Sequence, residues 1–142
     1  MLRNIPSIIS PELMKILMEM GHNDYIVLAD ANYPSASGAQ RAVRLEGVAV
    51  DALLDAVLQF FPLDNFTPNP VVLMKPRNEE PEPEIWSSFD RILKERDFCK
   101  AYKSFHLIER FDFYEYAKKA YAIVQTATTA RYANIALQKG VI

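Results

Sequence analysis

The chain has 142 residues, of which 50% are hydrophobic and 24% charged, and its 16 basic and 18 acidic residues give a net charge of -2. This balance argues against a nucleic-acid-binding surface, which usually has a basic excess. No apolar stretch approaches the ~20 residues of a membrane span. One cysteine and two histidines exclude an internal disulfide and leave few of the usual zinc ligands. We therefore expect one domain over residues 1–142, no metal site and a reducing compartment.

The first half of the chain predicts alternating helices and strands. Ser10, Pro11 and Glu12 suit the start of a helix as cap, first-turn proline and acidic residue at the positive end of the helix dipole. We expect this helix to end with Gly21 as its C-terminal cap and a buried strand to cover residues 25–29. Four further elements follow: a loop of small residues at 34–39, a strand at 41–45, a helix at 50–60 and a strand at 71–74.

The second half continues this alternation. We expect a solvated Pro/Glu-rich loop at 76–84, a helix at 85–96, a strand at 105–108, a short helix from 110 or 112, and strands at 121–126 and 134–137. The turn between the last two strands is too short for a crossover helix, so these strands are expected to pair antiparallel. The pattern predicts an α/β fold with a mostly parallel sheet.

Polar residues bracket the strand at 25–29. Asp30 lies where this strand ends, and open α/β sheets bind their ligands just beyond the carboxyl ends of the strands. His22 precedes the same strand, so it can join Asp30 only if the chain or a neighbouring subunit folds it back. A structural role is also open for each: His22 can cap the first helix, and Asp30 can cap a following turn. We favour a turn role for Asp24.

Several short motifs, in order and at matching spacing, resemble the sugar mutarotase family that includes ribose pyranase and L-fucose mutarotase, the RbsD/FucU family. These motifs are Ile9-Ser10-Pro11-Glu12-Leu13, Met20-Gly21-His22-Asn23-Asp24, Asp30-Ala31-Asn32-Tyr33-Pro34, Arg110-Phe111-Asp112-Phe113-Tyr114-Glu115, Tyr132-Ala133-Asn134-Ile135 and Lys139-Gly140-Val141. The resemblance covers essentially the whole chain. It implies one three-layer α/β/α domain of the RbsD type and a cytoplasmic, ring-shaped homo-oligomer, commonly a decamer.

The resemblance also implies the site. His22 corresponds to the family's proposed acid/base residue and Asp30 to its sugar-binding aspartate. The residue after the fourth strand is histidine in the ribose branch and arginine in the fucose branch, and this chain has Arg110. The pocket is completed by the terminal triplet Tyr132, Ala133 and Asn134. Structural roles are also open for Arg110 and Tyr132. Arg110 can form an exposed ion pair with Glu109, and the Tyr132 ring can pack in the core or in an interface.

One departure concerns the turn before this triplet. The fucose branch commonly has Thr-Gly-Glu there, whereas this chain has Thr126-Ala127-Thr128. Alanine adopts a positive φ less readily than glycine, and a carboxylate is missing. This departure bears on the shape of the turn and on the sugar preference, and not on the pair His22 and Asp30.

The function implied is a cofactor-independent isomerase that interconverts the α and β anomers of a hexose, most simply L-fucose. A ribose pyranase that exchanges pyranose and furanose forms is an alternative, which Arg110 disfavours. A sugar-binding or sensing protein without catalysis and a structural ring-forming partner of sugar-pathway proteins are further alternatives. Loss of anomer exchange in a His22→Ala variant distinguishes the enzyme from the sensor, and sugar-dependent stabilisation distinguishes the sensor from the structural partner.

Overall fold

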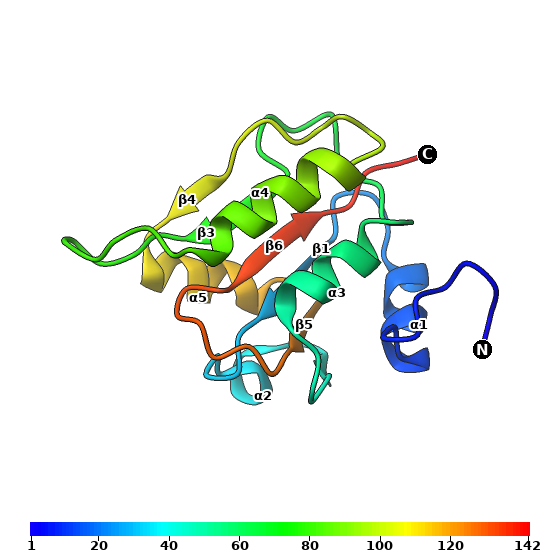
Figure 1. Cartoon of the computed structure of the whole chain (residues 1–142), viewed down its shortest axis with the longest axis horizontal. Helices are drawn as coiled ribbons and strands as arrows, with labels where there is room; N and C mark the ends of the chain where they lie inside the picture. Colours follow the sequence, from blue (N-terminus) through cyan, green and yellow to red (C-terminus); the bar gives the residue numbers. More distant parts are fainter.

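A computed structural model describes residues 1–142 as one six-stranded sheet with helices on both faces (Figure 1). The strands are β1 (Tyr25–Ala29), β2 (Ala42–Arg44), β3 (Val71–Met74), β4 (His106–Ile108), β5 (Ala122–Gln125) and β6 (Ile135–Gln138). The helices are α1 (Pro11–Glu19), α2 (Ser35–Gly38), α3 (Val50–Val57), α4 (Ile85–Arg96) and α5 (Arg110–Lys118). None of them is long and apolar enough to cross a bilayer.

The strand order is β2-β5-β1-β6-β3-β4. All neighbouring pairs are parallel except those of β6, which runs antiparallel to β1 on one side and to β3 on the other. This arrangement confirms the predicted α/β class and the mostly parallel sheet. The predicted pairing of the last two strands is wrong, because β1 lies between β5 and β6. The connection after β5 passes the end of β1 and places β6 on its other side.

The sheet is buried on both faces, as parallel sheets usually are. Along β1, Ile26 and Leu28 join a core cluster with residues of α1, α3 and α4, whereas Val27 and Ala29 join a second cluster with residues of α5. This alternation is the period of two that a strand imposes on its side chains. Each large apolar side chain buried here contributes about 2 kcal/mol to stability. The result is the three-layer α/β/α arrangement that the resemblance implies.

Two local predictions differ from the structure around β1. Helix α1 begins as expected, because the Ser10 hydroxyl accepts a hydrogen bond from the Leu13 amide at 3.1 Å. It ends at Glu19 with Met20 as its cap, and Gly21 instead donates its N–H to the Asp24 carboxylate at 2.8 Å. Asp24 thus has the predicted turn role. The second difference is α2, which forms within the predicted loop at 34–39, where small residues provide no apolar stripe to signal a helix.

Candidate functional site

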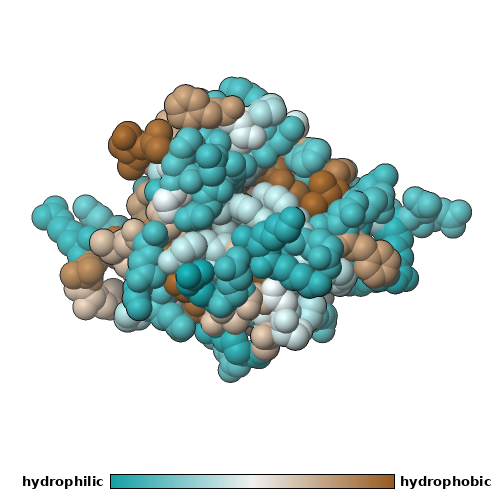
Figure 2. All heavy atoms as spheres, turned by 180° about the vertical axis from the view of Figure 1, so that it is seen from behind, coloured by the Kyte–Doolittle hydropathy of each residue, from teal (hydrophilic) through white to brown (hydrophobic).

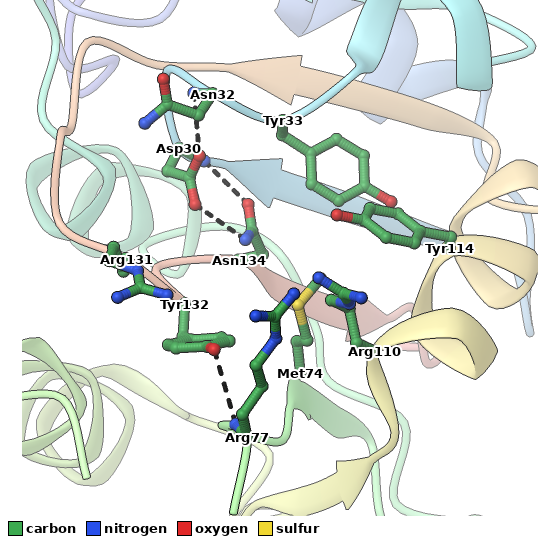
Figure 3. A pocket seen from close by; sticks show the side chains of 10 residues that line it. All are labelled: Asp30, Asn32, Tyr33, Met74, Arg77, Arg110, Tyr114, Arg131, Tyr132 and Asn134. Carbon is green, nitrogen blue, oxygen red and sulfur yellow. Dashed lines mark hydrogen bonds between the residues drawn. The ribbon is translucent and has the colours of Figure 1, made fainter. Parts of the chain in front are cut away.

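A pocket of about 230 Å³ opens at the edge of the sheet where the parallel strands end (Figure 3). Asp30 directly follows β1, Met74 ends β3, and Arg110 begins α5 two residues after β4. Because β6 is reversed, its first residues lie at this same edge, and Asn134 reaches the pocket from there. Ten residues line the pocket: Asp30, Asn32, Tyr33, Met74, Arg77, Arg110, Tyr114, Arg131, Tyr132 and Asn134.

Asp30 and Asn134 form the buried floor of this pocket. The Asn134 amide donates to Asp30 Oδ2 at 2.8 Å, and its Oδ1 accepts the Asp30 backbone N–H at 2.9 Å. Asp30 Oδ1 accepts the backbone N–H of Asn32 at 2.9 Å, which closes the predicted local turn. Burial raises the pKa of Asp30, and these hydrogen bonds, with those from the backbones of Tyr33 and Ala133, oppose the rise. The carboxylate is therefore held in one orientation beside the cavity.

The terminal triplet contributes two of its three side chains. Tyr132 has a positive φ of 56°, a conformation that is uncommon outside glycine. Its carbonyl accepts the indole N–H of Trp86 at 3.0 Å, and its hydroxyl accepts the backbone N–H of Arg77 at 3.4 Å. The half-buried ring thus lines the pocket while it also packs against both core clusters. Ala133 does not line the pocket, because its side chain is fully buried in the larger core cluster.

Arg110 lines the pocket without forming the ion pair with Glu109 that remained open from the sequence. Glu109 instead contacts Lys75 at 3.5 Å, and the Arg110 guanidinium lies 4.6 Å from the centre of the Phe111 ring. Sequence reasoning did not identify Arg77 or Arg131 as site residues. Arg131 pairs with Glu80 at 3.1 Å. Arg77 lies in the loop that was predicted as solvated, and Arg131 directly precedes the terminal triplet, so only their positions in space reveal them.

Two tyrosines form a further wall that was not assigned to the site. Tyr33 belongs to the motif after β1 and Tyr114 to α5, and their ring centres lie 5.5 Å apart. Burial raises the pKa of the Tyr33 hydroxyl, and the neighbouring Tyr114 and Asp30 add to this rise. The Tyr33 hydroxyl therefore stays protonated and available as a hydrogen-bond donor at neutral pH.

His22 does not lie in this pocket. It precedes β1, whereas Asp30 follows it, and the five residues of the strand span roughly 16 Å. His22 Nε2 lies 3.3 Å from Asp64 Oδ1, and the imidazole packs edge-on against Phe66 with 5.6 Å between ring centres. This contact replaces the helix cap that the sequence left open. A single copy of the chain therefore does not bring His22 and Asp30 together.

Asp64 is a functional candidate that the sequence did not signal. It is 1% exposed and lies 42 positions from its imidazole partner. Its backbone N–H donates to the Gln138 carbonyl at 3.0 Å, and its Oδ1 accepts the Phe66 N–H at 3.1 Å. The carboxylate is thus fixed behind His22, whose side chain is 39% exposed. His22 Nδ1 makes no hydrogen bond within the chain, so it is free to face a ligand.

The departure at residues 126–128 has a structural explanation. Thr126 Oγ1 donates to the Ala29 carbonyl at 2.9 Å, and Thr128 Oγ1 accepts the Val50 N–H at the start of α3 at 2.8 Å. Ala127 does not have a positive φ, so this turn does not need a glycine. None of the three residues lines the pocket. The turn instead connects the end of β1 to the start of α3 through these two hydrogen bonds.

Comparisons with known proteins agree on one family. The model of the RbsD / FucU transport protein family matches residues 3–142. The fucose mutarotase of Mus musculus is 43% identical over 148 residues, which cover 99% of this chain and 95% of that protein. A crystal structure of the fucose mutarotase from Streptococcus pneumoniae in complex with L-fucose is similar with a TM-score of 0.93 and 46% identity, covering 99% of both chains. The FucU structure from Bifidobacterium longum has a TM-score of 0.91 and 41% identity, again over 99% of both chains.

Proposed function

Since this chain belongs to the RbsD/FucU family, we propose that it is an isomerase that interconverts the α and β anomers of L-fucose. The relatives named fucose mutarotase match almost the whole chain, and one of them was crystallised with L-fucose. The observation that carries the proposal is the pocket floor, where Asp30 and Asn134 are buried and mutually hydrogen-bonded in the same cavity as Arg110. Such a set of fixed acceptors and donors suits the hydroxyl groups of a monosaccharide.

Mutarotation needs few groups. A base removes the proton of the anomeric hydroxyl while an acid protonates the ring oxygen, so the ring opens to an aldehyde. The carbonyl group then rotates, and the ring closes with the proton transfers reversed. An imidazole suits both directions because its usual pKa of about 6.5 lies near neutral pH. We assign this acid/base role to His22, and sugar binding to Asp30, Arg110, Tyr132 and Asn134, with Ala133 contributing its backbone.

His22 lies at the opposite end of β1 from the pocket, so we propose that the complete site forms between subunits of a homo-oligomer. One subunit supplies the pocket and a neighbour supplies His22. Exposed aromatic side chains beside each half support a contact at both places: Phe66 next to His22 is 74% exposed, and Phe111 next to Arg110 is 70% exposed. The resemblance to the family favours a ring-shaped decamer in the cytoplasm, where the single cysteine stays reduced.

One observation favours a second candidate. Because a single chain separates His22 from the sugar-binding residues, the same pocket would also serve a sugar-binding or sensing protein without catalysis. Such a protein keeps its affinity for sugar when His22 is removed and has no exchange activity to lose. A ribose pyranase is less well supported, because Arg110 occupies the position that is histidine in that branch.

The test is proton NMR magnetisation transfer between the anomers of L-fucose, with ribose, galactose and glucose measured beside it. We expect protein-dependent exchange that is strongest for L-fucose and falls by about a hundredfold or more in His22→Ala, because a positioned acid/base group contributes at least that much. His106→Ala is the matched control, since it removes the other histidine, which lies exposed on β4. Wild-type exchange in a folded, oligomeric His22→Ala variant would show that the assignment is wrong.

A further inference from the structure

Two arginines that line the pocket have no carboxylate partner. The third arginine of the lining, Arg131, pairs with Glu80 at 3.1 Å, and Lys75, which follows β3, pairs with Glu109 at 3.5 Å. Neither Arg77 nor Arg110 forms an ion pair or a side-chain hydrogen bond with its guanidinium. Two positive charges therefore lie unneutralised in one small cavity.

The absence of a partner for Arg77 is notable because acidic residues surround it in the sequence. The loop after β3 contains four glutamates, at positions 79, 80, 82 and 84. Glu80 is already engaged by Arg131, and its pKa is lowered mainly by its hydrogen bond with the Tyr132 side chain, then by the charges of Arg131 and Arg77. Arg77 directs its guanidinium into the pocket although these carboxylates are close in the chain.

The fold positions the backbone of Arg77 and the side chain of Arg110 at this pocket. The backbone N–H of Arg77 donates to the Tyr132 hydroxyl at 3.4 Å, and the Arg110 guanidinium stacks 4.6 Å from the Phe111 ring centre. Figure 3 shows both guanidinium groups projecting toward the Met74 side chain, on the side of the pocket opposite Asp30 and Asn134. Arg110 is also the first residue of α5, whose amino end favours negative charge.

We propose that Arg77 and Arg110 form an oxyanion-binding subsite, so that this pocket takes monosaccharides carrying a phosphate or carboxylate group. Guanidinium groups bind both oxyanions through paired N–H donors in a planar fork. Asp30 and Asn134 then face the hydroxyl groups at the other side of the cavity. The inference goes beyond the proposed function, because L-fucose carries no charge and needs no second arginine.

The test is calorimetric titration of the wild-type oligomer at constant ionic strength. Inorganic phosphate probes the first kind of oxyanion, and D-galacturonate probes the second, with D-galactose as the neutral sugar that differs from it only at carbon 6. We expect phosphate, galacturonate or both to bind and to compete with L-fucose. The ligand that binds identifies the source of the anionic group.

Two variants make the test specific. Arg77→Gln should weaken anion binding by about tenfold or more, because it removes a charge-assisted interaction, and should weaken L-fucose binding less. Arg91→Gln is the matched control, since Arg91 is an exposed arginine on α4 that pairs with Glu95, and it should leave all affinities unchanged. Circular dichroism checks that both variants are folded.

The outcomes separate this inference from the proposed function. If neither anion binds, or if Arg77→Gln binds it as tightly as the wild type, the subsite is overturned, whatever the exchange rate of L-fucose. An acidic side chain from a neighbouring subunit that neutralises Arg77 would give this negative result. If anions bind through Arg77 but L-fucose anomers do not exchange, the subsite stands and the mutarotase proposal fails.

Discussion

Asp64 stabilises one orientation of the His22 imidazole, which a proton-transferring residue needs. Its carboxylate is buried, accepts the Phe66 N–H and lies 3.3 Å from His22 Nε2. A carboxylate in this place selects the tautomer of a neutral imidazole and stabilises the imidazolium that forms during catalysis. His22 can then exchange protons through Nδ1. Asp64 is therefore a positioning residue in the proposed mechanism, because it acts through His22.

We predict that Asp64→Asn lowers the rate of L-fucose anomer exchange at saturating sugar by about tenfold or more, with a smaller effect on affinity. Asparagine keeps an oxygen for the Phe66 N–H but loses the negative charge beside the imidazole. Magnetisation transfer gives the rate and calorimetry the affinity. Asp55→Asn, which removes the carboxylate that pairs with Arg96 at 2.8 Å, is the control. Equal exchange in both variants would contradict the positioning role.

Strand β6 links the two halves of the proposed site, because it runs antiparallel to its neighbours from one end of the strands to the other. Before its first residue, Asn134 holds Asp30 in the pocket. Beyond its end, the Lys139 carbonyl accepts the Asn23 N–H at 3.0 Å and the Gly140 N–H donates to the Pro62 carbonyl at 2.9 Å. The same strand thus positions the turn that carries His22 and the segment that carries Asp64.

We predict that Gly140→Ala destabilises the protein by about 1–3 kcal/mol and slows anomer exchange. A Cβ at this position would lie 2.7 Å from the Leu63 carbonyl oxygen and 2.8 Å from Asp64 Cα, which are backbone atoms that cannot turn aside. Chemical denaturation measures the loss. Gly38→Ala is the control, because a Cβ there meets nothing within 4 Å. Similar stability of the two variants would refute the close approach at Gly140.

The surface of the whole molecule is consistent with assembly. Seen from behind, it is largely hydrophilic, with separate hydrophobic patches (Figure 2). Its exposed large apolar residues include Phe66, Phe111 and Met18, the last being 79% exposed. Exposed aromatic residues beside both halves of the site favour a head-to-tail contact between different surfaces, which closes into a ring when the rotation permits it.

We predict that mixed oligomers of His22→Ala and Arg110→Ala subunits recover activity that neither variant has alone. If each site takes His22 from one subunit and its pocket from the next, random equal mixing leaves about a quarter of the sites with both intact halves. Co-expression with two affinity tags yields the mixture, and magnetisation transfer measures it. Separately purified variants combined without subunit exchange are the control. Absence of recovery in the mixed oligomers would contradict a site shared between subunits.

Local patterns in the sequence predicted most of this molecule. The strand at 71–74 and the helix at 85–96 were predicted with their observed bounds, because prolines and apolar periodicity mark them without reference to distant residues. The family and the fold class are confirmed by the matching family model and the similar structures. The placement of Asp30 beyond a strand end follows from strand geometry alone, and so does the separation of His22 from it.

Long-range contacts supplied the rest. Local periodicity does not predict that β6 lies between β1 and β3. It also does not predict that Asp64 contacts His22, which is 42 positions away in the sequence. The sequence predicted Arg77 as part of a solvated loop. Arg77 lies in the pocket because the start of the loop after β3 passes beside Tyr132. The identities of residues that are neighbours in the sequence determine where helices and strands form. A binding site depends on which helices, strands and loops lie next to one another in the folded chain. That outcome is set by packing of the whole chain.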